Sequence, residues 1–116
     1  MSWADLGASH EIDVIVAAPG RPDVRTPIWV VAVGDELYVR SWKGEGGLWY
    51  RRALKHGAGT VVAGDERYAV RFTPAGEPGV NAQIDEAFRG KYGTSPYTEA
   101  MTEPPAAGTT LRLDRL

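Results

Sequence analysis

The sequence predicts a small, mainly β domain of the α+β class, built from antiparallel hairpins. Glycine–aspartate pairs at residues 34–35 and 64–65 each separate two segments rich in β-branched and aromatic residues. A leading glycine suits a two-residue type II′ hairpin turn. Only two or three short segments have the spacing of a helix. Because two hairpins of similar length recur in a short chain, we expect six strands that curl into a small barrel.

The length and composition indicate one globular domain. The 116 residues are 43% hydrophobic and 24% charged, ordinary values for a globular chain with a single core. We expect residues 1–10 to form an N-terminal lead-in and residues 11–116 to form the domain.

The composition argues against several classes of function. The net charge is −2, so no global basic field favours nucleic acid. The chain has no cysteine, and His10 and His56 are far apart, which argues against a metal site. No apolar run is long enough to cross a membrane, and the N-terminus lacks the basic start and apolar run of a signal peptide. We therefore expect a cytoplasmic protein with no nucleic-acid or membrane partner.

The first half of the chain is predicted to begin with three strands. Residues 11–18 are rich in β-branched side chains, and residues 26–33 are almost wholly apolar, as in a strand covered on both faces. Residues 36–42 alternate, so positions 37, 39 and 41 share one face and positions 38, 40 and 42 share the other. Trp29, inside the apolar run, is expected in the core.

A glycine-rich loop and a short cationic helix follow. Residues 43–47 contain three glycines, and residues 48–56 have basic side chains toward their end, where Gly57 suits a helix stop. The predicted inward stripe of this helix is Trp49, Tyr50, Ala53 and Leu54. Such a loop and helix can bind phosphate, because loop amides and a helix N-terminus both point donors outward.

The second half predicts another hairpin, one or two helices and a last strand. Residues 59–63 and 66–73 flank the second glycine–aspartate turn, with positions 68, 70 and 72 toward the core. Residues 80–93 have helical spacing, and Ser95 followed by a proline suits the start of a short helix. Residues 109–116 alternate as a final strand, with Leu111 and Leu113 inward.

Two motifs in this pattern carry a resemblance to a known group of proteins. The first motif consists of Gly20, Arg21, Arg25, Thr26 and Pro27. The second is a strand that ends in Ser41, then three glycines, then a tryptophan–tyrosine pair that opens a helix. Residues 19–54 thereby resemble the core of the split-barrel flavin- and deazaflavin-dependent oxidoreductases of the nitroreductase type. More closely, residues 11–116 resemble a compact domain family of unknown function that lies beside them.

The resemblance implies a fold, a cofactor and a set of site residues. It implies a small six-stranded split β-barrel with two or three short helices, a homodimer, and FMN or a deazaflavin in a groove at the dimer interface. The cofactor-binding residues it implies are Arg25, Thr26, Ser41, Trp42, Lys43, Gly44, Gly46, Gly47, Trp49 and Tyr50. No catalytic side chain is predicted, since a flavin-type cofactor itself carries the hydride.

In this interpretation the basic side chains and loop amides surround a phosphate. Arginine offers a bidentate fork and lysine a point charge, which suits Arg25 and Lys43, with Ser41 beside them. Trp42 or Trp49 would then lie against the ring. Both tryptophans also fit packing in the core or in an interface.

Two acidic residues support an alternative function. Where the resembling nitroreductases have a serine–glycine pair, this chain has a proline and Asp23, and Glu45 lies within the glycine-rich loop. Both carboxylates oppose an anion. The alternative is a non-catalytic domain, a small-molecule binder or protein-interaction module that has lost the cofactor. Whether the chain is an enzyme stays open on the sequence.

Overall fold

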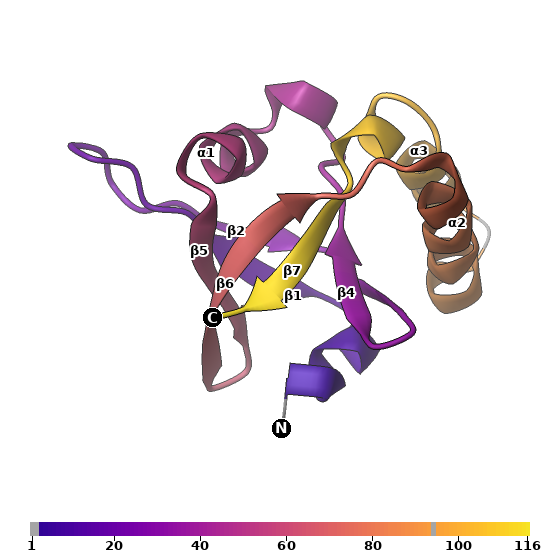
Figure 1. Cartoon of the computed structure of the whole chain (residues 1–116), viewed down its shortest axis with the longest axis horizontal. Coiled ribbons are helices and arrows are strands. Elements are labelled where there is room, and N and C mark those ends of the chain that lie inside the picture. Colours follow the sequence, from indigo (N-terminus) through magenta and orange to yellow (C-terminus); the bar gives the residue numbers. More distant parts are fainter. Residues whose placement is uncertain (1–2, 94) are drawn as a thin grey trace.

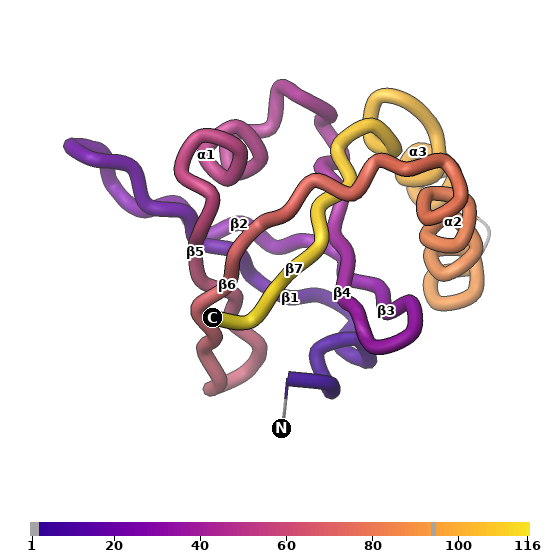
Figure 2. The backbone as a smooth tube through the Cα atoms, in the orientation of Figure 1, coloured from indigo at the N-terminus to yellow at the C-terminus, as the bar shows by residue number. Residues whose placement is uncertain are grey.

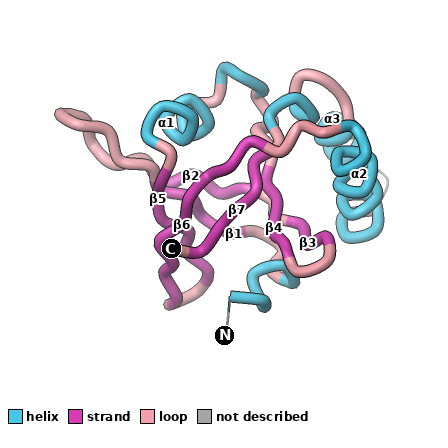
Figure 3. The backbone as a smooth tube through the Cα atoms, in the orientation of Figure 1, coloured by secondary structure: helices cyan, strands magenta, loops and turns pink. Residues whose placement is uncertain are grey.

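Seven antiparallel strands curl into one open sheet in the computed structural model, which describes residues 3–93 and 95–116 (Figure 1). The strands are β1 (Ile12–Ile15), β2 (Arg25–Ile28), β3 (Val31–Val33), β4 (Glu36–Val39), β5 (Ala58–Ala63), β6 (Glu66–Pro74) and β7 (Leu111–Arg115). Their order across the sheet is β2-β1-β5-β6-β7-β4-β3, so β2 and β3 form its edges. Figure 3 shows the strands wrapped round a common interior.

The three α-helices lie at two places on this sheet. The α-helices are α1 (Leu48–His56), α2 (Pro78–Tyr92) and α3 (Pro96–Thr102), and the 3₁₀ helices are η1 (Trp3–Ala8), η2 (Gly44–Gly46) and η3 (Ala106–Thr109). Figure 1 shows α2 and α3 together beside β4, whereas α1 lies above β5 at the other end. The loop between β1 and β2 projects away from the body (Figure 2). Within the described ranges, no helix is both long and apolar enough to cross a membrane.

The prediction of six strands was wrong, because the apolar run at residues 26–33 forms two strands. β2 pairs only with β1, and β3 pairs only with β4. At the break, polar side chains of α2 replace ladder partners: the Val30 N–H donates to Tyr92 Oη at 3.2 Å, and Lys91 Nζ donates to the Val30 carbonyl. The result is an open half-barrel of seven strands. The break depends on residues more than sixty positions away, which a local pattern does not contain.

Both predicted hairpins are confirmed. Val33 pairs with Glu36 and Ala63 pairs with Glu66, which leaves a two-residue turn in each case. Gly34 and Gly64 have φ of 60° and 59°, and no described residue other than glycine has a positive φ. A positive φ at the first turn position alone is the signature of the type II′ turn.

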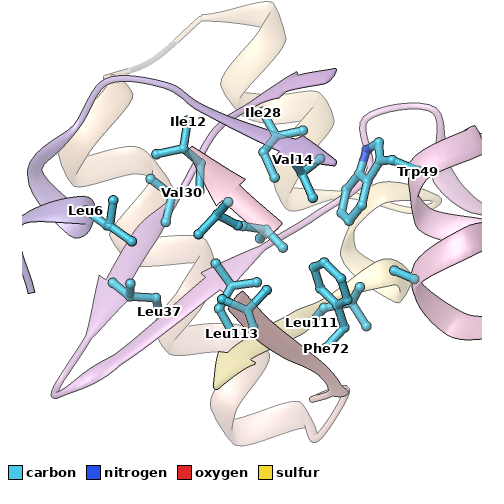
Figure 4. Close-up of a cluster of buried hydrophobic side chains, with 14 of the residues drawn as sticks. Leu6, Ile12, Val14, Ile28, Val30, Leu37, Trp49, Phe72, Leu111 and Leu113 are labelled. Carbon is cyan, nitrogen blue, oxygen red and sulfur yellow. The ribbon is translucent and has the colours of Figure 1, made fainter. Parts of the chain in front are cut away.

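Two apolar clusters lie on opposite faces of β4. Leu37 and Val39 join the main cluster inside the curled sheet, where strands from both halves of the chain meet (Figure 4). Tyr38 joins a second cluster under α2, with Ile84 and Phe88. The alternation over residues 36–42 therefore marks a strand buried on both faces, with the interior on one side and helices on the other.

The helix predictions hold except at one position. Trp49, Tyr50 and Ala53 of α1 are buried, and Gly57 ends the helix with a left-handed φ of 76°. Leu54 was expected in the same stripe but is 49% exposed, because α1 contacts the sheet along a narrower strip than its apolar residues span. α3 begins after Ser95, and Leu111 and Leu113 of β7 are buried as predicted.

Candidate functional site

A pocket of about 530 Å³ lies where β2, the end of β4, the start of α1 and α3 meet. We call it the Ser41 pocket. Its volume falls within the range of small-molecule sites, roughly 300–1,000 Å³. Its walls are mostly apolar and aromatic, with a few polar groups, which is the usual make-up of a ligand site.

Six of the residues predicted for a cofactor line this pocket. They are Thr26, Ser41, Trp42, Lys43, Gly47 and Trp49. Their grouping follows from the chain path, because β4 runs directly into the loop at residues 40–47 and α1 starts at its end.

The other four predicted residues lie outside the lining. Arg25 is exposed and its Nε donates to Asp13 Oδ2 at 2.6 Å, across the β1–β2 pair. Gly44 is buried against Pro105, where a Cβ would come within 2.6 Å of the proline Cβ. Gly46 is exposed, and Tyr50 is buried in the main core cluster. None of these four residues therefore forms part of the pocket wall.

Ser41 has a buried hydroxyl without a partner. The residue is 1% exposed, and its Oγ is the one fully buried side-chain polar atom in the described part that makes no hydrogen bond. Its backbone is held, since the Ser41 N–H donates to Thr109 Oγ1 at 2.8 Å. Such an orphaned group costs free energy, ~1–3 kcal/mol, unless something else satisfies it. Because Ser41 lines the pocket, its hydroxyl is a candidate hydrogen-bonding group for a ligand.

Gly47 and the start of α1 lie next to this hydroxyl. A Cβ at Gly47 would collide with Ser41 Oγ, so glycine is what allows the close approach. No side chain caps α1, and the first amide to bond within it is that of Arg51, which donates to the Gly47 carbonyl at 3.0 Å. The amides before it have no partner within the helix, and Leu48 and Trp49 both line the pocket. Helix N-termini of this kind attract anions.

Two amides of the glycine-rich loop already have acceptors within the loop. The Gly44 N–H donates to the Ser41 carbonyl at 2.9 Å, and the Gly47 N–H donates to the Gly44 carbonyl at 3.2 Å. The loop is therefore a compact turn with η2 inside it. Donors for a ligand at this end come from Ser41, from the first turn of α1 and from Lys43.

The charges around the pocket differ from those expected. Asp23 and Glu45 are exposed and neither lines the pocket, whereas Glu11 does. Lys43 lines the pocket and makes no ion pair within the described residues. Lys43, which has no ion-pair partner among the described residues, and the carboxylate of Glu11 thus line the same, mostly apolar pocket.

Aromatic side chains surround the mouth of the pocket. Trp42 and Tyr97 are 56% and 63% exposed, and their ring centroids lie 6.2 Å apart. Trp49 is buried at the inner wall. Trp29, expected in the core, is only partly buried, stacks on Tyr92 with centroids 3.9 Å apart, and lines the pocket. A planar ring has several faces to pack against here.

Sequence reasoning missed the wall that α3 contributes. Tyr97 and Met101 face the pocket from α3, and Arg40 lines it from the residue before Ser41. No local pattern signals this, because α3 and the loop after β4 are more than fifty residues apart in the chain. Ser95 and its proline predicted the helix but not what the helix covers.

Tyr50, a predicted site residue, stays protonated near neutral pH. Burial raises the pKa of its hydroxyl, and the nearby charge of Glu45 raises it further. The described residues contain no group of three His, Asp or Glu side chains placed to hold a metal. The polar side chains that line the pocket include Thr26, Ser41, Lys43, Glu11 and Tyr97.

Residues 3–113 match the family described as "Uncharacterized protein conserved in bacteria (DUF2255)", and the chain belongs to this family. Among curated proteins, none matches the chain in sequence. The resemblance to a split-barrel family of unknown function is thereby confirmed.

Solved structures confirm the fold at low sequence identity. A putative pyridoxamine 5′-phosphate oxidase from Listeria innocua is 11% identical with a TM-score of 0.64, over 97% of this chain and 87% of that one. A conserved hypothetical protein from Mycobacterium tuberculosis is 12% identical with a TM-score of 0.65, over 100% and 79%. An F420 reductase is 13% identical with a TM-score of 0.55, over 100% and 94%. At such identities the likeness establishes the split-barrel fold alone; the homodimer stays a prediction.

Proposed function

We propose that this member of the DUF2255 family binds a flavin-type cofactor, FMN or a deazaflavin, in the Ser41 pocket. The observation that carries the proposal is the buried, unpartnered hydroxyl of Ser41 beside the uncapped start of α1. The similar folds of a protein titled a putative pyridoxamine 5′-phosphate oxidase and of an F420 reductase support this class of ligand.

The residues of the pocket fit the two ends of such a ligand. Ser41 Oγ and the first amides of α1 would donate to its phosphate, and Lys43 would add a positive charge. Trp42 and Tyr97 would pack on its ring at the mouth of the pocket. When bound, the cofactor would supply hydride transfer, so the reaction class we propose is a nitroreductase-like oxidoreduction. The chain itself would bind, orient and shield the ring.

A second candidate function is a non-catalytic small-molecule binder on the same fold. It is favoured by the engagement of Arg25 with Asp13, and of the Gly44 and Gly47 amides within the loop. These groups leave fewer donors for a phosphate than the sequence implies. In this case the pocket would take a smaller, largely apolar ligand.

Titration of FMN and of a deazaflavin, followed by ligand fluorescence, tests the proposal. We expect the wild-type chain to bind one of them and Ser41→Ala to bind it roughly 10- to 100-fold more weakly. That loss corresponds to a hydrogen bond to a charged group, ~1.5–3 kcal/mol.

Ser9→Ala is the matched control, because Ser9 lies outside the pocket lining and its backbone makes its hydrogen bonds to Leu6 and Lys91. If Ser41→Ala and wild type bind the cofactor with equal affinity, the Ser41 hydroxyl does not contribute to binding it. No binding of either cofactor up to about 1 mM, a free energy near −4 kcal/mol, would favour the second candidate.

A further inference from the structure

Arg40 has the largest of the fully buried side chains in the described part of the chain, at 1% exposure. Burial lowers the pKa of its guanidinium, and the hydrogen bond and charge of Asp85 oppose that shift. Burying a guanidinium is expensive, and a well-packed apolar side chain often stabilises a protein as well. An arginine at this position therefore does something besides filling space.

All five N–H donors of Arg40 have acceptors in the protein. Nε donates to Thr110 Oγ1 at 2.9 Å. Nη1 donates to Asp85 Oδ1 at 2.6 Å and to the Met101 carbonyl at 2.9 Å. Nη2 donates to the carbonyl and to Oδ1 of Asn81, at 3.3 and 3.4 Å. Although Arg40 lines the pocket, it has no donor left for a ligand.

The acceptors come from three separate segments. Asn81 and Asp85 belong to α2, Met101 belongs to α3, and Thr110 precedes β7. The guanidinium also lies over the ring of Phe88, 5.4 Å from its centroid. Figure 1 shows α2 and α3 side by side next to β4. A planar fork of five donors can fix several segments at once, which a lysine with its single nitrogen does not do.

The next residue in the chain is Ser41, the anchor of the pocket. Its N–H donates to Thr109 Oγ1 at 2.8 Å, and that hydroxyl donates to the Ala106 carbonyl at 2.6 Å. Two adjacent threonines thus bind two other adjacent residues. Thr109 Oγ1 accepts from the Ser41 N–H, and Thr110 Oγ1 accepts from Arg40 Nε. The same cluster holds the carbonyl of Met101, whose side chain faces the pocket one helical turn beyond Tyr97.

We propose that Arg40 is a positioning residue for the Ser41 pocket. It keeps α3 and the Ser41 hydroxyl, which lie on either side of the ligand, at a fixed distance from each other. The inference rests on the proposed function, because it assigns Arg40 a part in binding the same ligand. Arg40 acts through Ser41 and α3 and makes no contact with the ligand.

Hydrogen exchange of Arg40→Met tests the coupling without any ligand. We expect the amides of α3 and of residues 41–47 to exchange at least tenfold faster, while the β5–β6 hairpin keeps its wild-type rates. Arg89→Met is the matched control, because Arg89 is exposed on α2 and its one ion pair among the described residues is with Glu86. Unchanged exchange in α3, or an equal increase in every segment, would overturn the inference.

Titration of FMN and the deazaflavin then tests the link to the site. We expect Arg40→Met to bind about tenfold more weakly than wild type. In the Ser41→Ala background the same change should have a smaller effect, since coupled residues are not additive. If wild type and Arg40→Met bind a flavin equally, the inference fails while the proposed function stands. If wild type binds neither cofactor but α3 and residues 41–47 loosen in Arg40→Met while the β5–β6 hairpin does not, the proposed function fails and the positioning of the pocket walls stands.

If Arg40→Met does not fold, Asp85→Asn tests the same inference, because it weakens the contact between Arg40 and α2. The Asp85 side chain is 24% exposed, and asparagine keeps an oxygen that can accept from Arg40 Nη1 while it removes the negative charge. We expect the same local loosening of α3 and residues 41–47, to a smaller extent, because Asp85 is one of five acceptors. Exchange in Asp85→Asn identical to wild type in these two segments would count against the inference.

Discussion

At the scale of single residues, Tyr92 joins three segments through one hydroxyl. Its Oη donates to the His10 carbonyl at 2.7 Å and accepts the Val30 N–H at 3.2 Å, while its ring stacks on Trp29. Lys91 beside it donates to the carbonyls of Gly7 and Ser9, at 2.9 and 2.6 Å. The end of α2 thereby fastens η1 and the break between β2 and β3.

Because of the Tyr92 hydroxyl, we expect the free energy of unfolding to fall as the pH becomes alkaline. Burial raises its pKa to about 12, from an ordinary value of about 10. The folded state therefore keeps the proton more tightly than the unfolded chain. The resulting stability is complete below pH ~10 and is lost as the pH rises toward 12.

Urea unfolding of wild type and Tyr92→Phe across this range measures the effect. At pH 7 we expect the variant to be less stable by ~1 kcal/mol, the value of a lost hydrogen bond, and the difference should shrink between pH 10 and 12. Tyr97→Phe, which removes an exposed hydroxyl, is the control. A difference that stays constant or widens with pH would contradict this account of Tyr92.

At the scale of elements, α3 is short and depends on its cap. Ser95 Oγ accepts the Thr98 N–H at 3.2 Å, and seven residues follow. Because α3 carries Tyr97 and Met101, its order bears on the pocket as well as on stability.

Replacing the cap separates these effects. Ser95→Ala should lower the free energy of unfolding by ~1 kcal/mol, since helix caps are worth about that much. Ser95→Asp keeps an accepting oxygen and adds a favourable charge at the helix start, so it should remain close to wild type. Thermal melts compare the two variants. A loss in Ser95→Asp as large as in Ser95→Ala would mean that the cap is not what Ser95 contributes.

Elements whose signals are local could be predicted from the sequence. The two hairpins follow from Gly34 and Gly64, and the end of α1 follows from Gly57, because turn and cap geometry depends on adjacent residues. The break at residues 29–30 could not be predicted, since Lys91 and Tyr92 supply its hydrogen bonds from α2.

The same distinction divides the candidate site. Ser41, Trp42, Lys43, Gly47 and Trp49 were predicted together because one short stretch of the chain carries the resemblance; Gly44, Gly46 and Tyr50 of the same stretch were also predicted but lie outside the pocket lining. The opposite wall comes from α3 and was not predicted. A segment that only the tertiary fold brings close does not affect the spacing of the residues that it covers. The local sequence pattern therefore does not predict it.

At the scale of the whole molecule, the curled sheet brings β1, β5 and β6 into close contact at Gly59. A Cβ there would come within 2.7 Å of the Ile15 carbonyl oxygen and 2.9 Å of the Phe72 ring. The first contact is to a backbone atom and the second is to a core side chain, so neither atom can move away without a substantial cost in free energy.

A pair of glycine substitutions tests this contact. Gly59→Ala should destabilise the protein by ~1–3 kcal/mol, as over-packing in a core does. Gly90→Ala, on an exposed part of α2 with open space around it, should stabilise by ~0.5–1 kcal/mol because alanine favours the helix. Urea midpoints give both values. Equal shifts of the same sign would contradict a special role for Gly59 in the sheet.

The most direct test of the central claim is the location of the ligand in the whole molecule. Amide ¹⁵N–¹H spectra recorded during titration with FMN or the deazaflavin report every segment at once. We expect the largest shifts on residues 41–49 and 97–101, the two walls of the Ser41 pocket, while the signals of the turn at Gly64 stay unchanged. Shifts centred on another part of the chain, or none at saturating ligand, would contradict it.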